Sequence, residues 1–126
     1  MTRLWLLLAG INGFMAVALG AYGTHGLADV LTDQGQINFQ LASQYQLFHA
    51  IAFVGVAWLS SRAPVFGNIA GGLFLLGVFF FGVSLYTGEL SGSAFLASLA
   101  PYGGASFMLG WITVAAAGLL GRMQPA

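Results

Sequence analysis

Four long stretches of the chain carry no charged residue and consist mainly of apolar residues. They are residues 4–23, 41–59, 65–88 and 102–121, each 19 to 24 residues long. About 20 helical residues cross a hydrocarbon core of about 30 Å, and lipid offers backbone amides no hydrogen-bond partner, so each stretch is expected to be a helix. A transmembrane barrel would need strands of about ten residues with strict polar alternation, which residues 73–81 lack. The pattern predicts an all-α polytopic membrane protein, a single four-helix transmembrane bundle over residues 1–126.

The charged residues lie outside these stretches and predict an orientation. If the chain crosses four times, every arginine falls on one side of the membrane and every acid on the other. Cytoplasmic loops are enriched in Lys and Arg, so we expect a multi-pass protein of the cell inner membrane with both termini in the cytoplasm. In chain order the charged residues are Arg3, Asp29, Asp33, Arg62, Glu89 and Arg122.

The connections between the stretches are short. The inner turn ends at Pro64, which suits the first turn of the next helix. The first outer loop, residues 24–40, is expected to hold a short interfacial helix around residues 27–31, and Asp33 is expected to cap the helix that follows. Residues 89–100 form the second outer loop, with an interfacial segment of its own.

Composition agrees with a membrane location. The chain is 59% hydrophobic and 5% charged, whereas soluble domains carry about 25% charged residues. Its three arginines and absence of lysine provide no basic patch, which argues against nucleic-acid binding. The chain has no cysteine, which excludes disulfides, thiolate catalysis and cysteine-ligated metals. A cleaved signal peptide is an alternative for the first stretch, with small residues at 16–18, but its apolar run is too long for a typical signal.

Small residues recur every three or four positions in the first and last stretches, which places them on one face of each helix. Because lipid provides little hydrophobic drive for association, such faces allow close backbone approach and predict tight packing. The helix-packing residues that we expect are Gly13, Gly20, Gly103 and Gly110. Trp111, near the middle of the last stretch, is expected to be a packing residue as well.

Polar residues within the stretches need a partner or a function, because polar groups are costly inside a membrane. At 1.5 Å per residue, most of them fall in the outer half of the bundle, and Asn12 is the exception near mid-membrane. The candidate polar or ligand cluster is His25, Tyr45, Gln46, His49, Ser84 and Tyr86. The turn at the outer end of the last stretch adds Pro101, Gly103 and Gly104.

Two interpretations of this cluster remain open. One is an interhelical hydrogen-bond network that fixes helix register. The other is a proton, ion or cofactor site centred on His25 and His49, since histidine can ligate haem or a metal. Two nitrogen ligands leave a zinc or copper site incomplete, so no metal or cofactor is predicted. The chain has neither HExxH nor GxSxG and no pair of acids within a stretch, so no enzymatic activity is predicted.

Five short segments of the chain form a recognisable pattern. They are residues 20–27 (GAYGTHGL), 45–50 (YQLFHA), 81–86 (FGVSLY), 101–104 (PYGG) and 110–111 (GW). Together they resemble family 423 of the domains of unknown function, which includes the eukaryotic transmembrane protein 256. The departures from the family pattern are small: Thr24, Val83 and Ala100 stand where the family usually has Ala, Gly and Thr. The resemblance implies a multi-pass plasma-membrane protein of bacteria and brings no known activity.

The function expected from these observations is that of an uncharacterised structural or accessory membrane component. It would contact membrane lipid and associate with itself or with a larger membrane complex. The alternative is binding of an ion, proton, haem or metal, quinone or lipid at the polar cluster around His25 and His49.

Overall fold

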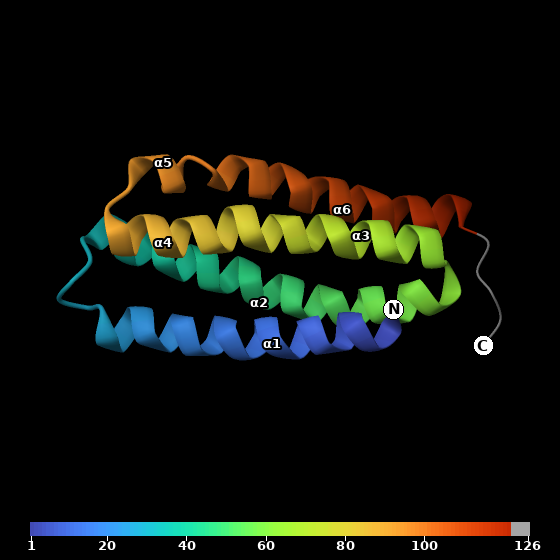
Figure 1. Ribbon diagram of the computed structural model, residues 1–126, viewed down its shortest axis with the longest axis horizontal. Coiled ribbons are helices and arrows are strands. Elements are labelled where there is room, and N and C mark those ends of the chain that lie inside the picture. The colour runs from blue at the N-terminus through green and yellow to red at the C-terminus, as the bar shows by residue number, and fades with distance from the viewer. Residues whose placement is uncertain (122–126) are drawn as a thin grey trace.

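The computed structural model describes residues 1–121, and all regular secondary structure in that part of the chain is helical (Figure 1). Arg122, which the orientation argument assigns to the cytoplasm, lies outside the described residues. The elements are α1 (Thr2–Ala21), the π-helix η1 (Tyr22–Gly26), α2 (Asp33–Arg62), α3 (Pro64–Gly77), the π-helix η2 (Val78–Val83), α4 (Ser84–Ser91), α5 (Ala94–Ala97) and α6 (Ala100–Leu120).

Three continuous helical segments of the described chain are long and apolar enough to cross a membrane. They are Thr2–Gly26, Pro64–Ser91 and Ala94–Leu120. The remaining long helix, α2, has 30 residues, which at 1.5 Å per residue is long enough to cross a membrane. Its polar residues make it less apolar than the other three segments. The contacts of these polar residues within the bundle are therefore the key to its place in the fold.

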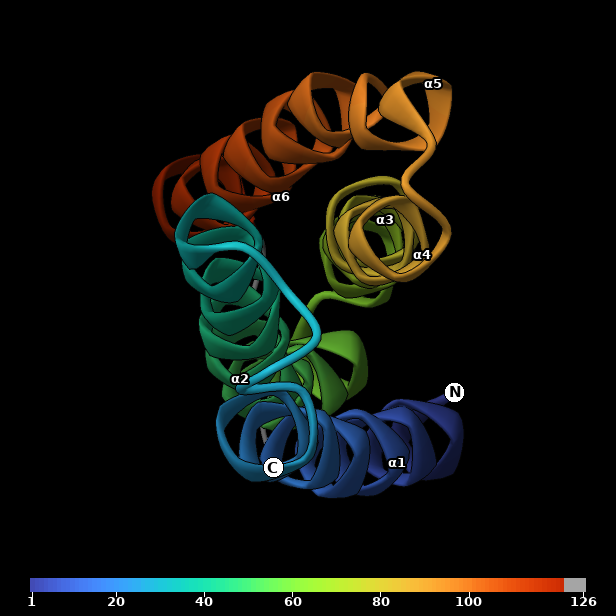
Figure 2. The ribbon, with the colours of Figure 1, turned by 90° about the vertical axis from the view of Figure 1, so that its left-hand side faces the viewer.

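Four antiparallel rods make up the bundle: α1 with η1, α2, α3 through η2 to α4, and α6 (Figure 1). The closest packing joins α1 to α2, α2 to α3, and α3 to α6. Seen end-on, α2 and the α3–α4 rod lie between α1 and α6 (Figure 2). The main core cluster lies where α1, α2, α3 and α6 meet, and its largest fully buried side chains are Phe53 and Phe74.

The connection from η1 to α2 differs from expectation in two ways. Residues 27–31 form a turn, in which the amides of Val30 and Leu31 both donate to the Leu27 carbonyl at 3.1 Å, and no helix. Leu27 is buried and Leu31 packs against the same core cluster, whereas Val30 is 70% exposed. The cap of α2 is Thr32, whose hydroxyl accepts from the Gly35 amide at 3.1 Å, and Asp33 is the first helical residue.

The other boundaries lie closer to the predictions. Pro64 begins α3, and Pro101 lies in the first turn of α6, as expected for proline. Glu89 lies within α4 instead of a loop, because this helix continues to Ser91 and ends at Gly92, whose φ of 69° is left-handed. The connection from α4 to α6 contains the single-turn helix α5, capped by the Ser93 hydroxyl.

The glycines of α6 allow close approach to the α3–η2 rod. A Cβ added at Gly103 would lie 2.6 Å from the Phe81 Cβ and 2.8 Å from the Gly77 carbonyl oxygen. One added at Gly110 would meet the Phe74 ring at 2.6 Å. On α1, a Cβ at Gly20 would lie 2.6 Å from the Ser43 hydroxyl, whereas one at Gly13 would make only an ordinary contact of 3.8 Å with Ala50.

We predict that Gly103→Ala destabilises the protein by about 1–3 kcal/mol, because the added methyl group forces α6 away from the η2 backbone. The matched control is Gly104→Ala on the same helix, where an added Cβ meets nothing within 4 Å and helix propensity favours alanine by up to about 1 kcal/mol. Unfolding midpoints followed by circular dichroism in one detergent measure both changes. Equal midpoints for the two variants would contradict this packing.

Candidate functional site

Three polar side chains of α2 bind α1 in sequence. The Gln40 side-chain amide donates to the Gly20 carbonyl at 3.1 Å, and the Ser43 hydroxyl donates to the Ala16 carbonyl at 2.9 Å. The Gln46 amide then donates to the Asn12 side-chain oxygen at 3.2 Å. Donors spaced by three residues lie on one face of a helix. These three hydrogen bonds set the register of the two antiparallel helices.

Gln46 also links α1 to α4. The Tyr86 hydroxyl donates to the Gln46 side-chain oxygen at 2.9 Å, and the Asn12 amide donates to the Leu8 carbonyl at 2.9 Å. Asn12, Gln46 and Tyr86 are each at most 7% exposed. The Tyr86 ring packs edge-on against Phe39 with centroids 4.8 Å apart. The Asn12–Gln46–Tyr86 network is therefore uncharged, buried and shared by three helices.

His49 belongs to a separate set that links α2 to α6. Its Nδ1 lies 2.7 Å from the Tyr45 carbonyl oxygen, and the Trp111 indole N–H donates to its Nε2 at 3.2 Å. A carbonyl can only accept and an indole N–H can only donate, so these neighbours assign the neutral histidine with its proton on Nδ1. The ring is 4% exposed and stacks on Phe107 with centroids 3.6 Å apart.

The six residues of the predicted cluster thus separate. Gln46 and Tyr86 are bonded to each other, while His49 contacts the backbone of Tyr45. The Ser84 hydroxyl bonds to the Phe80 carbonyl of its own rod. His25 lies exposed in η1. Thr24, the neighbour of His25 in sequence, accepts a hydrogen bond from the Gln40 side chain of α2 at 2.5 Å. Gln40 lies nine residues before His49 on α2, which is about 14 Å along the helix at 1.5 Å per residue.

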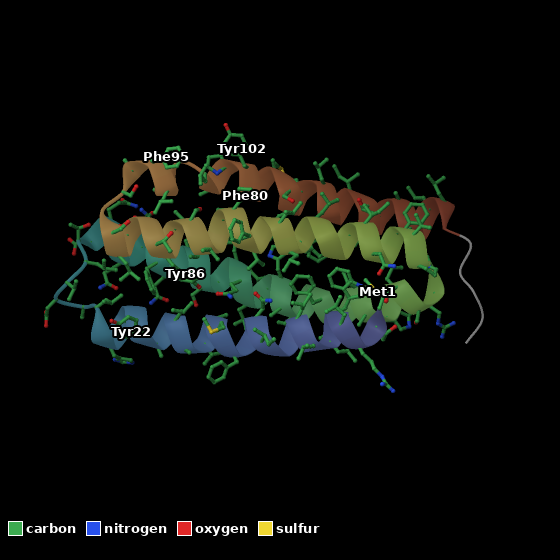
Figure 3. The ribbon with its side chains drawn as sticks, viewed as in Figure 1. Met1, Tyr22, Phe80, Tyr86, Phe95 and Tyr102 are labelled. Atoms are coloured by element: carbon green, nitrogen blue, oxygen red, sulfur yellow. The ribbon has the colours of Figure 1, made fainter. Side chains whose placement is uncertain are left out.

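The exposed aromatic residues show which faces lie outside the bundle. Tyr86 points inward between α4 and α2, whereas Tyr22, Phe95 and Tyr102 lie on the outer surface (Figure 3). In the first turns of α6, Gly103 faces the η2 backbone, but Tyr102 is 68% exposed and Gly104 has open space beside it. Gly103 therefore serves packing, and the hollow beside His49 is lined by other residues.

A second polar contact ties the first turns of α2 to the last turns of α4. The Asn38 side-chain amide donates to Glu89 at 2.7 Å, and Asn38 in turn accepts from Gln34 at 3.1 Å. The sequence pattern places Glu89 in a loop, so it does not predict this pair. It does not predict the hydrogen bond of Trp111 either, although an indole N–H within an apolar helix requires an acceptor, and that requirement is a usable signal.

The capacity of these residues for chemistry is limited by the bonds they already make. Within residues 1–121, no three His, Cys, Asp or Glu side chains come together in a group that could hold a metal ion. A ligand at His49 Nε2 would have to displace the Trp111 N–H. The arrangement can transmit helix position across the bundle, because its bonds join α2 to α1, to α4 and to α6.

The fold and its apolar outer surface define the class as an all-α membrane protein. The chain is 33% identical to a UPF0382 membrane protein of Staphylococcus epidermidis over 117 residues, covering 93% of this chain and 96% of that one. It is 34% identical to a UPF0382 membrane protein of Haemophilus influenzae over 115 residues, covering 91% and 93%. The UPF0382 membrane protein YwdK of Bacillus subtilis is 32% identical, with 91% and 95% covered.

Residues 19–104 match the model of the family described as "Protein of unknown function (DUF423)", and the chain belongs to this family. The family resemblance inferred from the sequence segments is thereby confirmed. No solved structure shows a significant match to the chain.

We predict that Gln46→Leu destabilises the protein by about 1–3 kcal/mol, because it leaves polar groups of Asn12 and Tyr86 buried without their partner. Combining it with Tyr86→Phe should give a cost below the sum of the two single changes, with a coupling of about 0.6–1.7 kcal/mol. Unfolding midpoints for the double-mutant cycle in one detergent measure the coupling.

The control for this cycle is Gln44→Leu, a change of the same kind at an exposed position on the same helix. It should leave the unfolding midpoint nearly unchanged. Fully additive costs for Gln46→Leu and Tyr86→Phe would show that the Asn12–Gln46–Tyr86 network does not couple the helices.

Proposed function

We propose that this chain is a four-span structural or accessory component of the cell inner membrane, with both termini in the cytoplasm. The observation that supports the proposal most is that the buried polar groups of the protein find their hydrogen-bond partners within the bundle. Within residues 1–121, every buried side-chain nitrogen or oxygen has a hydrogen-bond partner. Such a bundle is built to hold a fixed shape, since breaking any of these bonds in lipid leaves a polar group unpaired.

The crossing of α2 is supported by its connections. Only Ala63 separates α2 from α3, and α2 runs antiparallel to both α1 and α3 (Figure 1). If the flanking helices cross the bilayer, α2 has to return through it to join them. Ser43 and Gln46 of α2 bond to α1 and α4, while apolar residues such as Phe48 and Ile51 are exposed on α2.

The orientation is supported by the ends of the rods that come together. The Thr2 and Ser60 hydroxyls lie 3.5 Å apart, so Arg3 and Arg62 belong to the same end of the bundle. The Asn38–Glu89 bond joins the beginning of α2 to the end of α4, at the opposite end. By the positive-inside rule the arginine end is the cytoplasmic one.

A role in binding an ion, proton, haem, metal or quinone at His25 and His49 has weaker support. Both ring nitrogens of His49 are engaged, and His25 stands apart at the outer end of α1 and η1. The proposal instead favours protein partners, either further copies of this chain or a larger membrane complex. The exposed apolar surface of α1, which includes Leu7 and Phe14, is available to lipid or to such partners.

We predict that purification in a mild detergent gives a defined oligomer or a complex with a stoichiometric partner by mass measurement. His49→Ala should preserve this assembly and lower only the stability, by about 1–3 kcal/mol, because the Trp111 N–H loses its acceptor. A monodisperse monomer without a partner would count against the proposal. A stoichiometric metal or a visible absorbance band that disappears in His49→Ala would favour the ligand-binding alternative.

A further inference from the structure

An apolar groove runs along the outside of the bundle between α2 and α6. It consists of two adjoining hollows of about 380 Å³ and 460 Å³, which share Trp111. The larger hollow lies beside Tyr45 and His49, and the smaller one extends toward the inner end, past Gly55 to Trp58 and Leu59.

The groove exists because α2 and α6 both pack on α3 instead of closely on each other. Phe74 of α3 contributes to its lining. Gly55 of α2 and Gly118 of α6 also line it, and a Cβ added at either glycine would meet nothing within 4 Å. Two glycines that face open space are not needed for packing within the chain, and they widen the groove.

We propose that this groove holds an acyl chain of an anionic phospholipid from the surrounding membrane, with the lipid headgroup at Arg62. The inference rests on the proposed crossing of α2. From Arg62 to Ala52, which lines the groove beside Trp111, is ten residues or about 15 Å of helix. That length equals one leaflet of a hydrocarbon core of about 30 Å.

The charge at the inner end of the groove selects the headgroup. The Arg62 guanidinium carbon lies 5.8 Å from the centroid of the Trp58 ring, and Trp58 lines the groove. A guanidinium presents several N–H donors that match phosphate oxygens, and tryptophan is enriched at headgroup depth. Asp33 and Glu89 belong to the opposite end of the bundle, so the field at the Arg62 end favours a net negative lipid.

Tryptophan quenching by brominated lipid chains tests the proposal, because Trp58 and Trp111 both line the groove while Trp5 is buried. The protein is placed in phosphatidylcholine vesicles that contain a minor fraction of chain-brominated phosphatidylglycerol, or the same fraction of chain-brominated phosphatidylcholine. We expect brominated phosphatidylglycerol to be enriched about fivefold at the groove, the factor expected for one cation near an anionic headgroup, and to quench correspondingly more.

Two variants separate the headgroup from the acyl chain. Arg62→Gln should make the two brominated lipids quench equally, and Gly118→Leu should reduce the excess by filling the groove. The matched control is Gly72→Leu on α3, where an added Cβ also meets nothing within 4 Å, and it should retain the excess. If Gly118→Leu fails to fold, Arg62→Gln carries the test, since it leaves Gly55 and Gly118 of the groove unaltered.

Equal quenching by the two lipids in the unmodified protein overturns the proposal. An excess that persists in both Arg62→Gln and Gly118→Leu overturns it as well. Equal quenching accompanied by a dimeric mass assigns the groove to a second copy of the chain instead. Quenching by neither lipid also overturns the proposal. With a monomeric mass it contradicts the membrane crossing of α2 as well, and this result is distinct from a crossing helix without lipid preference.

Discussion

Hydrogen bonding in lipid is the constraint on which this fold depends, and it falls chiefly on α2. A bilayer offers no water to polar side chains, so a helix with several of them must find acceptors and donors on its neighbours. On α2, Gln40 and Ser43 reach backbone carbonyls of α1, and Gln46 joins side chains from α1 and α4. These bonds bring the polar helix into the bundle and determine its rotation relative to the three apolar ones.

The two sides of the bundle are held by different physical means. The contact of α1 with α2 relies on side-chain donors, whereas α3 and α6 rely on glycines that face aromatic rings. Gly110 lies against Phe74, and Gly77 lies against Phe107. His49 connects the two sides, because it is stacked on Phe107 like an aromatic residue while its nitrogens bind Tyr45 and Trp111. Where neither side-chain hydrogen bonds nor glycine–ring contacts join α2 and α6, the groove between these two helices remains.

Apolar length, the two prolines at helix starts and the polar side of α2 could all be predicted from sequence, because each depends on local pattern. The division of the polar cluster could not. Tyr45 is 38% exposed and the adjacent Gln46 only 7%, a difference that depends on the absolute rotation of α2, which spacing alone does not determine. His49 and Trp111 are 62 positions apart in sequence, so their pairing depends on how closely their two helices approach in space. Thr32 and Asp33 are both good caps, and only the backbone distinguishes them.

We propose that α2, despite its polar residues, crosses the membrane from the outside to the cytoplasm. Because the natural chain has no cysteine, single cysteines can be introduced without background and labelled by a membrane-impermeant thiol reagent. The account predicts that Gln34→Cys is labelled only from outside, Ser61→Cys only from the cytoplasmic side, and the lipid-facing Val54→Cys from neither. Labelling of Gln34→Cys and Ser61→Cys from the same side, or labelling of Val54→Cys as fast as either, would contradict it.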